Sequence, residues 1–333
     1  MKQPVCSKIS ALALAVAGLA CSVPVQATVF SGTLYYTNYN GGNNVNSVSY
    51  SYDDVANNAA LGSANNIAAL PGADGIIFAP NGNLLIGGAG TGFVYEVTTA
   101  GALVGSGASQ GASYHLALDP SGNKVWTSNF GGALVDVPIA PLAAGTLHGL
   151  SGSDTGLTQV AFTPGGNVFY VNGSPNGFGN VGLLNMTTFA TTRLYTSLLP
   201  AHGMIYDPYT SLITLFGDGA VGTIDATTGG GLKTRSGINC DFDQGAVDGQ
   251  GHALIAGCNS ITFIDYRSSG DITDPTNPTY IFGGFGAIDD VAPLTGLGSN
   301  PTPTGLPEPS TMLLAALGLL ALGYLQRQRT PAR

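Results

Sequence analysis

One motif recurs along the middle of this 333-residue chain at a nearly constant interval. Its clearest copy, residues 74–88, reads DGIIFAPNGNLLIGG. An apolar run, a Pro-x-Gly-Asn turn and a second apolar run are typical of a β-hairpin, because Pro fixes φ and Gly accepts a positive φ. Related turns begin at positions 80, 120, 164, 208 and 249, although the fourth has lost its glycine and the fifth its proline. Intervals of 40, 44, 44 and 41 residues predict one four-stranded propeller blade per repeat.

The two ends of the repeat region predict one further blade. Residues 33–37 and 45–50 have the composition of strands, but no Pro-x-Gly-Asn turn precedes them. Residues 288–294, with the sequence IDDVAPL, are similar to the strand that opens each repeat and would complete this blade. Closing the ring in this way removes exposed sheet edges. We therefore expect an all-β, six-bladed β-propeller over residues 28–294, with five internal repeats and one blade closed by both ends of the body.

Charge argues against one class of partner. Between Thr28 and Leu306 the chain has five bases and eighteen acids, a net charge of −13. A nucleic-acid partner would require a basic surface, so we expect none.

Residues 1–27 have the features of a secretory signal peptide. Lys2 and Lys8 form a basic start, an apolar run covers residues 9–20, and the small residues of Val25-Gln26-Ala27 precede Thr28. We expect signal peptidase to cleave after Ala27. A lipoprotein signal ending at Cys21 is the alternative.

The C-terminal end has three consecutive parts. Residues 295–305 are rich in Gly, Pro, Thr and Ser and predict a flexible linker. The second part is the triplet Pro307, Glu308 and Pro309, and the third is an apolar segment over about residues 312–325 followed by Arg327 and Arg329. About fourteen apolar residues make roughly 21 Å of helix, which flanking aromatic and arginine side chains can extend toward the 30 Å core of a bilayer. A basic tail stays in the cytoplasm and leaves the body outside.

Residues 306–333 resemble the PEP-CTERM sorting signal, which is also known as the ice-binding protein C-terminal domain. In that family an exosortase, a transpeptidase-like membrane protease, recognises the segment and releases the protein to the cell surface or its exopolysaccharide. The resemblance implies an exported protein that is transiently anchored by a C-terminal membrane helix and then becomes surface-bound or extracellular. A plain C-terminal anchor is the alternative. The name does not imply ice binding, because the body lacks flat repeated threonine arrays.

The repeats resemble the NHL, YncE-like and gluconolactonase-like propellers, whose blades open with an apolar strand, a D-P-x-G-N turn and another apolar strand. The resemblance covers most of residues 33–294. It implies the architecture and no particular activity, since propellers host many functions. We expect Trp126, on a second strand, to pack between blades.

Aligning the repeats brings six polar residues to one position, just before the innermost strand of each blade: Asp74, Tyr114, Thr158, His202, Asp243 and Asp289. In a propeller these side chains would ring one mouth of the central channel. Three carboxylates and a histidine there could hold Ca²⁺ or another hard cation, or bind a sugar. Alternatively, each Asp or Thr caps local backbone amides where its strand begins. His115, one residue further on, either faces the same channel or forms a hydrogen bond within the core.

Two cysteines remain after signal-peptide removal, Cys240 and Cys258. A fifth hairpin that pairs Val247 with His252 would place Cys240 opposite Asn259, next to Cys258. In an exported protein this favours a disulfide, and two buried thiols are the alternative.

The inventory of catalytic motifs does not favour an enzyme. There is no zinc-ligand spacing, nucleophile elbow or phosphate-binding loop. Gluconolactonase-like enzymes use a glutamate near the N-terminus of the fold, whereas the single glutamate of this body, Glu96, lies on a third strand far from the channel. We expect a surface or matrix protein that binds protein or polysaccharide partners. A metal-dependent lactonase or related hydrolase with its site at the channel mouth is one alternative, and a spacer without a ligand is another.

Overall fold

The structure is a computed structural model that describes residues 29–38, 44–111, 113–173, 179–199, 201–238 and 242–292. These residues form 26 strands in six sheets. Among them there is no helix of the length and hydropathy needed to cross a membrane. The expected signal peptide, linker and sorting segment lie outside the described residues.

The chain divides into two compact units. The larger one, residues 31–52 and 59–300, holds five of the six sheets and all of the sixth except a few residues at its strand ends. Of the smaller unit, the structure describes residues 29–30 and 53–58. Residues 54–57 form a turn, in which Asp53 Oδ1 accepts hydrogen bonds from the amides of Val55 and Ala56 at 3.0 and 2.8 Å.

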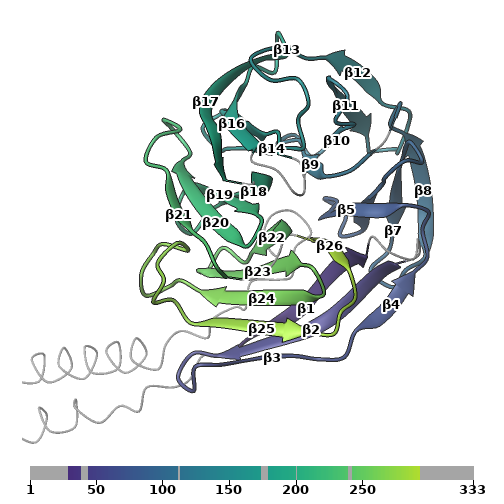
Figure 1. The fold of residues 1–333 in the computed structure, drawn as a ribbon. Helices are drawn as coiled ribbons and strands as arrows, with labels where there is room; N and C mark the ends of the chain where they lie inside the picture. The colour runs from purple at the N-terminus through teal and green to yellow at the C-terminus, as the bar shows by residue number, and fades with distance from the viewer. Residues whose placement is uncertain are drawn as a thin grey trace, which may run out of the picture. The chain divides into compact units, whose positions relative to one another are not determined.

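Five sheets follow the order of the chain and are numbered here as blades (Figure 1). Blade 1 contains β5 (Ala73–Phe78), β6 (Leu84–Gly88), β7 (Phe93–Val97) and β8 (Leu103–Ala108). Blade 2 contains β9 (Leu116–Leu118), β10 (Lys124–Ser128), β11 (Ala133–Pro138) and β12 (Thr146–Gly149). Blade 3 contains β14 (Gln159–Phe162), β15 (Val168–Val171), β16 (Gly179–Leu184) and β17 (Ala190–Leu199), with β13 (Ser151–Gly152) parallel to β17. Blade 4 contains β18 (Ala201–Asp207), β19 (Leu212–Gly217), β20 (Ala220–Asp225) and β21 (Lys233–Arg235). Blade 5 contains β22 (Phe242–Val247), β23 (His252–Gly257), β24 (Ser260–Asp265) and β25 (Thr279–Gly283).

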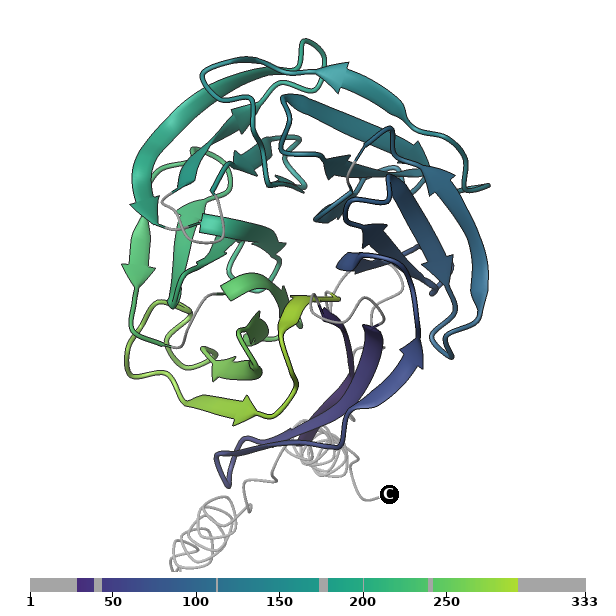
Figure 2. The ribbon, with the colours of Figure 1, turned by 45° about the vertical axis from the view of Figure 1, so that its right-hand side comes forward.

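The sixth blade joins both ends of the body. It contains β26 (Ile288–Val291), β1 (Val29–Asn38), β2 (Asn44–Asp53) and β3 (Asn58–Leu61), with β4 (Asn65–Ala68) also paired to β2. Figure 2 shows the yellow-green strand β26 beside the purple strands at the start of the body. Strands β26 and β1 are antiparallel, and Tyr36 pairs with Val291. The predicted all-β, six-bladed propeller with one composite blade is therefore confirmed.

The predicted turns have the backbone geometry that requires glycine. Gly82 and Gly122 have φ values of 86° and 70°, and each amide donates to a carbonyl three residues earlier. In the first turn, Glu96 from β7 is buried and its Oε1 accepts hydrogen bonds from the side-chain amides of Asn81 and Asn83 at 2.8 and 2.6 Å. Glu96 therefore stabilises this turn.

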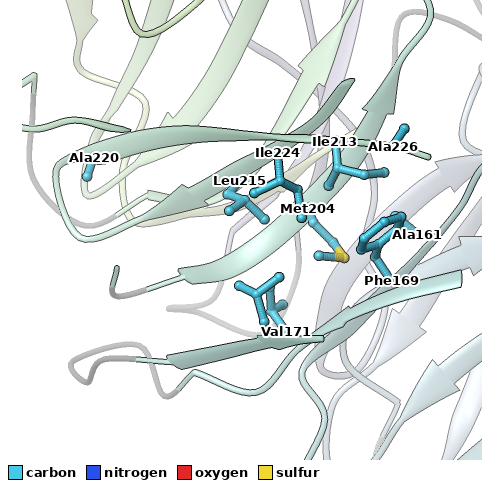
Figure 3. Close-up of a cluster of buried hydrophobic side chains, with 10 residues drawn as sticks. Ala161, Phe169, Val171, Met204, Ile213, Leu215, Ala220, Ile224 and Ala226 are labelled. Carbon is cyan, nitrogen blue, oxygen red and sulfur yellow. The ribbon is translucent and has the colours of Figure 1, made fainter. Parts of the chain in front are cut away.

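Apolar side chains from neighbouring blades pack against one another and form the core. Figure 3 shows the cluster between blades 3 and 4, which includes Ala161, Phe169, Val171, Met204, Ile213, Leu215, Ala220, Ile224 and Ala226. Trp126 packs with Val160 and Tyr170 of blade 3, which confirms its predicted place between blades. Because both faces of these strands are buried, polar and apolar residues alternate along them less strictly than in a sheet that exposes one face to solvent.

The fifth hairpin corrects the predicted register. Val247 pairs with Ala253, not with His252, and a register shift follows before Phe242 pairs with Gly257. Cys258 is disulfide-bonded. Its predicted partner, Cys240, lies outside the described residues, so this pairing stays a prediction.

Candidate functional site

The candidate site lies where the innermost strands β5, β18, β22 and β26 begin. The innermost strands of neighbouring blades contact one another around the ring. In each of these four strands, the register with its partner strand shifts by one residue at the predicted site position: at 74–75, at 202, at 243–244 and at 289–290. Such β-bulges re-aim side chains and are common next to functional sites.

Two glycines allow the strands to approach closely here. A Cβ on Gly75 would lie 2.3 Å from the carbonyl oxygen of Tyr114, and one on Gly203 would lie 2.2 Å from that of Asp243. Because each glycine directly follows a site residue, its lack of a side chain lets polar groups of neighbouring blades converge.

Two histidines and one aspartate form the centre of the cluster. His115 and His202 are 2% and 3% exposed, and their ring centroids lie 4.7 Å apart. Asp243 Oδ1 lies 3.3 Å from His115 Nε2 and 3.2 Å from His202 Nε2. These three groups could hold one metal ion, since their ligand atoms all lie within 4.8 Å of one another.

Three further aspartates adjoin this centre. Asp290 is fully buried, and its Oδ2 lies 2.9 Å from His115 Nδ1. Asp74 is buried, its Oδ1 accepts a hydrogen bond from the Gly75 amide at 2.9 Å, and it forms a second possible ligand set with His115 and Asp290. Asp289 is buried beside them.

The carboxyl groups are difficult to ionise together. Burial, together with the charges of Asp289 and Asp290, raises the pKa of Asp74 well above its usual range. Burial and the charges of Asp243 and Asp290 do the same to the pKa of Asp289. Burial raises the pKa of Asp243 to about 7, although the charge of His115 acts in the opposite direction. A cation at this position would relieve the repulsion among these groups.

The two histidines differ in charge. Burial alone would lower the pKa of His115, but Asp290 and Asp243 outweigh it and raise this pKa well above 6.5. Burial, and then the charge of His115, lowers the pKa of His202 to about 2. His202 is therefore a neutral imidazole, the form that binds metals.

The structure brings four of the six aligned residues together, namely Asp74, His202, Asp243 and Asp289. Thr158 instead directs its hydroxyl at the backbone carbonyls of Val171 and His202, at 3.2 and 3.0 Å, and so bonds carbonyl oxygens and not the amides that the capping alternative names. Tyr114 packs on Phe130, with ring centroids 4.3 Å apart.

Sequence reasoning missed two residues of this region. Asp290 was predicted only as part of a strand, although adjacent aspartates in IDDV are an unusual feature of an inner strand. Phe130 is 36% exposed, and its ring lies edge-on to those of both His115 and His202, at 6.5 and 6.2 Å. Nothing in the sequence around Phe130 indicates that its ring lies beside the two imidazoles.

Two hollows lie near the innermost strands. A mainly apolar cavity of about 440 Å³ is lined by residues of β5, β9, β14, β18 and β22, among them Ile77, Leu116 and Ile205. A second one, of about 470 Å³, lies between blades 2 and 3, where Trp126 and Phe189 contribute to its wall.

Comparisons with known proteins agree with this architecture. Residues 306–329 match the PEP-CTERM protein-sorting motif. A chain from the crystal structure of a nidogen–laminin complex is similar, with a TM-score of 0.59, 13% identity, and coverage of 79% of this chain and 98% of that one. A candidate 6-phosphogluconolactonase from Bacteroides fragilis has a TM-score of 0.50 and 14% identity, with coverage of 81% and 98%. At these identities the likeness shows the fold alone. No curated protein sequence matches the chain.

The fold is a six-bladed β-propeller, and residues 306–329 of the same chain carry the PEP-CTERM protein-sorting motif. An exosortase recognises this motif, which implies an extracytoplasmic protein that is exported and sorted to the cell surface.

Proposed function

We propose that this protein acts at the cell surface or in the extracellular matrix, where its propeller binds polysaccharide or protein partners after an exosortase has cleaved the sorting segment. The observation that carries the proposal is the sorting motif at residues 306–329, on the C-terminal side of the propeller. The signal peptide, over residues 1–27, and the transient membrane anchor at about residues 312–325 are parts of the same proposal.

The cavity between blades 2 and 3 is a candidate polysaccharide site. His148 and Phe189 stack there, with centroids 4.2 Å apart, and Lys124 lies 4.5 Å from the Trp126 ring. Partly exposed aromatic rings next to polar groups suit sugar binding, because a sugar offers an apolar face and hydroxyl groups.

Sorting is tested with the full chain carrying a C-terminal epitope in a host that contains an exosortase. We expect loss of the epitope and release of the body, and retention of both when Pro307, Glu308 and Pro309 are replaced by alanine. Replacing Pro301 and Pro303 of the linker is the matched control. Equal processing of the triple variant and the control, or unchanged processing after deletion of the exosortase, would refute sorting by this motif.

Polysaccharide binding is tested by co-sedimentation of the processed protein with exopolysaccharide from an exosortase-bearing strain. We expect Phe189→Ala to weaken retention at least tenfold, whereas Phe93→Ala, at an outer position that is 40% exposed, should not. No retention of the unaltered protein, or equal losses in both variants, would exclude this cavity as the site.

The second candidate function is a metal-dependent lactonase or related hydrolase. The observation in its favour is the His–Asp cluster on inner strands that also line a mainly apolar cavity, which would suit an aliphatic ring. Water would add to the lactone carbonyl and the ring C–O bond would break, giving a hydroxy acid. Lactone hydrolysis that is abolished by a chelator and by Asp243→Asn would support this function, and hydrolysis no faster than that of the free metal would refute it.

A further inference from the structure

We propose that His115 Nε2, His202 Nε2 and Asp243 Oδ1 bind one borderline divalent cation of the Zn²⁺ or Co²⁺ class, and that Asp290 positions His115 for this role. This inference goes beyond surface binding and does not depend on it. It also differs from the hard-cation site expected from the sequence, because the structure adds a second imidazole to the donor set.

The distances within the cluster suit metal ligands. Ligand atoms that bind a tetrahedral Zn²⁺ at about 2.0–2.1 Å lie about 3.3–3.4 Å from one another. Asp243 Oδ1 lies 3.3 and 3.2 Å from the two imidazole nitrogens. Among the described residues, however, this oxygen has no hydrogen-bond partner although it is buried. Two of the three ligand separations therefore match those around one tetrahedral ion, and the ligand atoms of all three residues lie within 4.8 Å of one another.

The second nitrogen of His115 supports the same assignment. Its Nδ1 lies 2.9 Å from Asp290 Oδ2, within hydrogen-bond distance. With Nδ1–H donating to Asp290 Oδ2, the nitrogen that binds a cation is Nε2, which gives up its own proton as the ion binds. Metal-ligating histidines usually donate their other N–H to a carboxylate in this way, which fixes the tautomer and raises the basicity of the ligand.

Two further buried polar atoms of the cluster lack partners. Within the described part of the chain, Asp290 Oδ1 and His202 Nδ1 make no hydrogen bond, and their residues are 0% and 3% exposed. Neither atom is a ligand of the proposed ion. Because unsatisfied buried polar atoms are rare in proteins, they mark a cluster whose polar groups do not satisfy one another, as is common at functional sites.

The donor set selects the kind of cation. Ca²⁺ and Mg²⁺ prefer oxygen ligands, whereas two imidazoles and one carboxylate suit Zn²⁺, Co²⁺ and related ions. Three protein ligands leave a fourth position for water or another ligand, which is the pattern of reactive rather than structural zinc sites. Asp243 is the most accessible of the three, with 21% of its side chain exposed.

The test uses the full chain, purified in detergent without a polyhistidine tag and stripped of metal with a chelator. Titration with Co²⁺ should give the visible absorption bands of a tetrahedral site at one ion per chain, and Zn²⁺ should displace them. Millimolar Ca²⁺ should not. We expect His202→Gln to weaken Co²⁺ binding at least 100-fold, and His148→Gln, on the outer strand β12, to change it less than twofold.

Asp290→Asn tests the positioning role. It should weaken binding 10- to 100-fold and shift the Co²⁺ spectrum, because the ligand remains while its partner loses charge. Circular dichroism and thermal melting of each metal-free variant report folding, and the near-isosteric Asp243→Asn replaces His202→Gln if that variant does not fold. Absence of Co²⁺ bands in the unaltered chain, displacement by Ca²⁺, or equal binding by the His202 and His148 variants would overturn the proposal. None of these results bears on sorting or on polysaccharide retention, so the proposals fail separately.

Discussion

Replacing Asp154 by alanine should destabilise the propeller more than any single loss of a surface charge. This buried carboxylate accepts hydrogen bonds from Tyr170 Oη at 2.6 Å, from Asn172 and Asn180 side-chain amides at 2.9 and 2.8 Å, and from Arg193 Nη2 at 2.6 Å. Removing one partner of such a buried network costs about 3–5 kcal/mol, since the remaining groups lose their acceptor. At about 2 °C per kcal/mol for a domain of this size, the melting temperature should fall by roughly 6–10 °C.

Differential scanning calorimetry of the full chain measures this difference. Asp218→Ala, which removes an exposed carboxylate near the β19–β20 turn, is the matched control and should change the melting temperature by less than about 1 °C. A decrease below about 2 °C for Asp154→Ala, or one equal to that of the control, would refute the assignment of Asp154 as the centre of blade 3's polar network.

The same pair of proteins gives a pH prediction. Burial would raise the pKa of Asp154, but hydrogen bonds from Arg193, Tyr170 and Asn180 outweigh it and hold this pKa below its usual value. The stabilisation is therefore present above the unfolded pKa of about 3.9 and is lost as the pH falls through the lower folded value. The difference in melting temperature between the unaltered chain and Asp154→Ala should be constant from pH 8 to 5 and shrink below about pH 4. A difference that is already smaller at pH 5 would contradict this sign.

Three substitutions test the packing. Gly203→Ala should cost about 1–3 kcal/mol, because its Cβ would meet the Asp243 carbonyl oxygen, while Gly105→Ala has open space and should be neutral in the same denaturant titration. Glu96→Ala should cost about 2 kcal/mol or more through the loss of two turn hydrogen bonds, and an unchanged urea midpoint would contradict this. Trp126→Phe should lower the free energy of unfolding by about 1–3 kcal/mol, because it removes buried volume and the indole N–H that donates to Asp119 Oδ2 at 2.9 Å. Thermal melting measures this loss, and an unchanged melting temperature would place the ring outside the core.

The architecture could be predicted from the sequence because each blade repeats one local signal. Apolar inner strands recur with one period, and four of the five internal turns keep a glycine with positive φ, at positions 82, 122, 166 and 251, so the five internal blades follow from the spacing of these signals. The composite blade followed from the similarity of residues 288–294 to the opening strands. The short strands β13 and β4 were not predicted, because they pair at blade edges where no periodic apolar pattern marks them.

The candidate site could be predicted only in part. Alignment brought Asp74, His202, Asp243 and Asp289 to one level because inner strands begin at equivalent positions. Strict alternation along a strand would direct Asp289 and its neighbour Asp290 to opposite faces. The bulge in β26 instead lets both side chains be buried in the same cluster. The sequence of this strand contains no pattern that predicts the bulge.

The bulge in β26 also links the site to closure of the ring. Thr37 of β1 lies opposite this bulge, where its hydroxyl accepts a hydrogen bond from the Asp290 amide and donates to the carbonyl of Asp74. One residue of the N-terminal strand thus connects the first and last inner strands that supply the cluster. Because β26 is the last strand among the described residues and pairs with the N-terminal strand β1, the cluster is complete only when both ends of the body have met. A cation bound there would stabilise the closed ring over open forms by its binding free energy, since an open ring lacks the complete set of ligands.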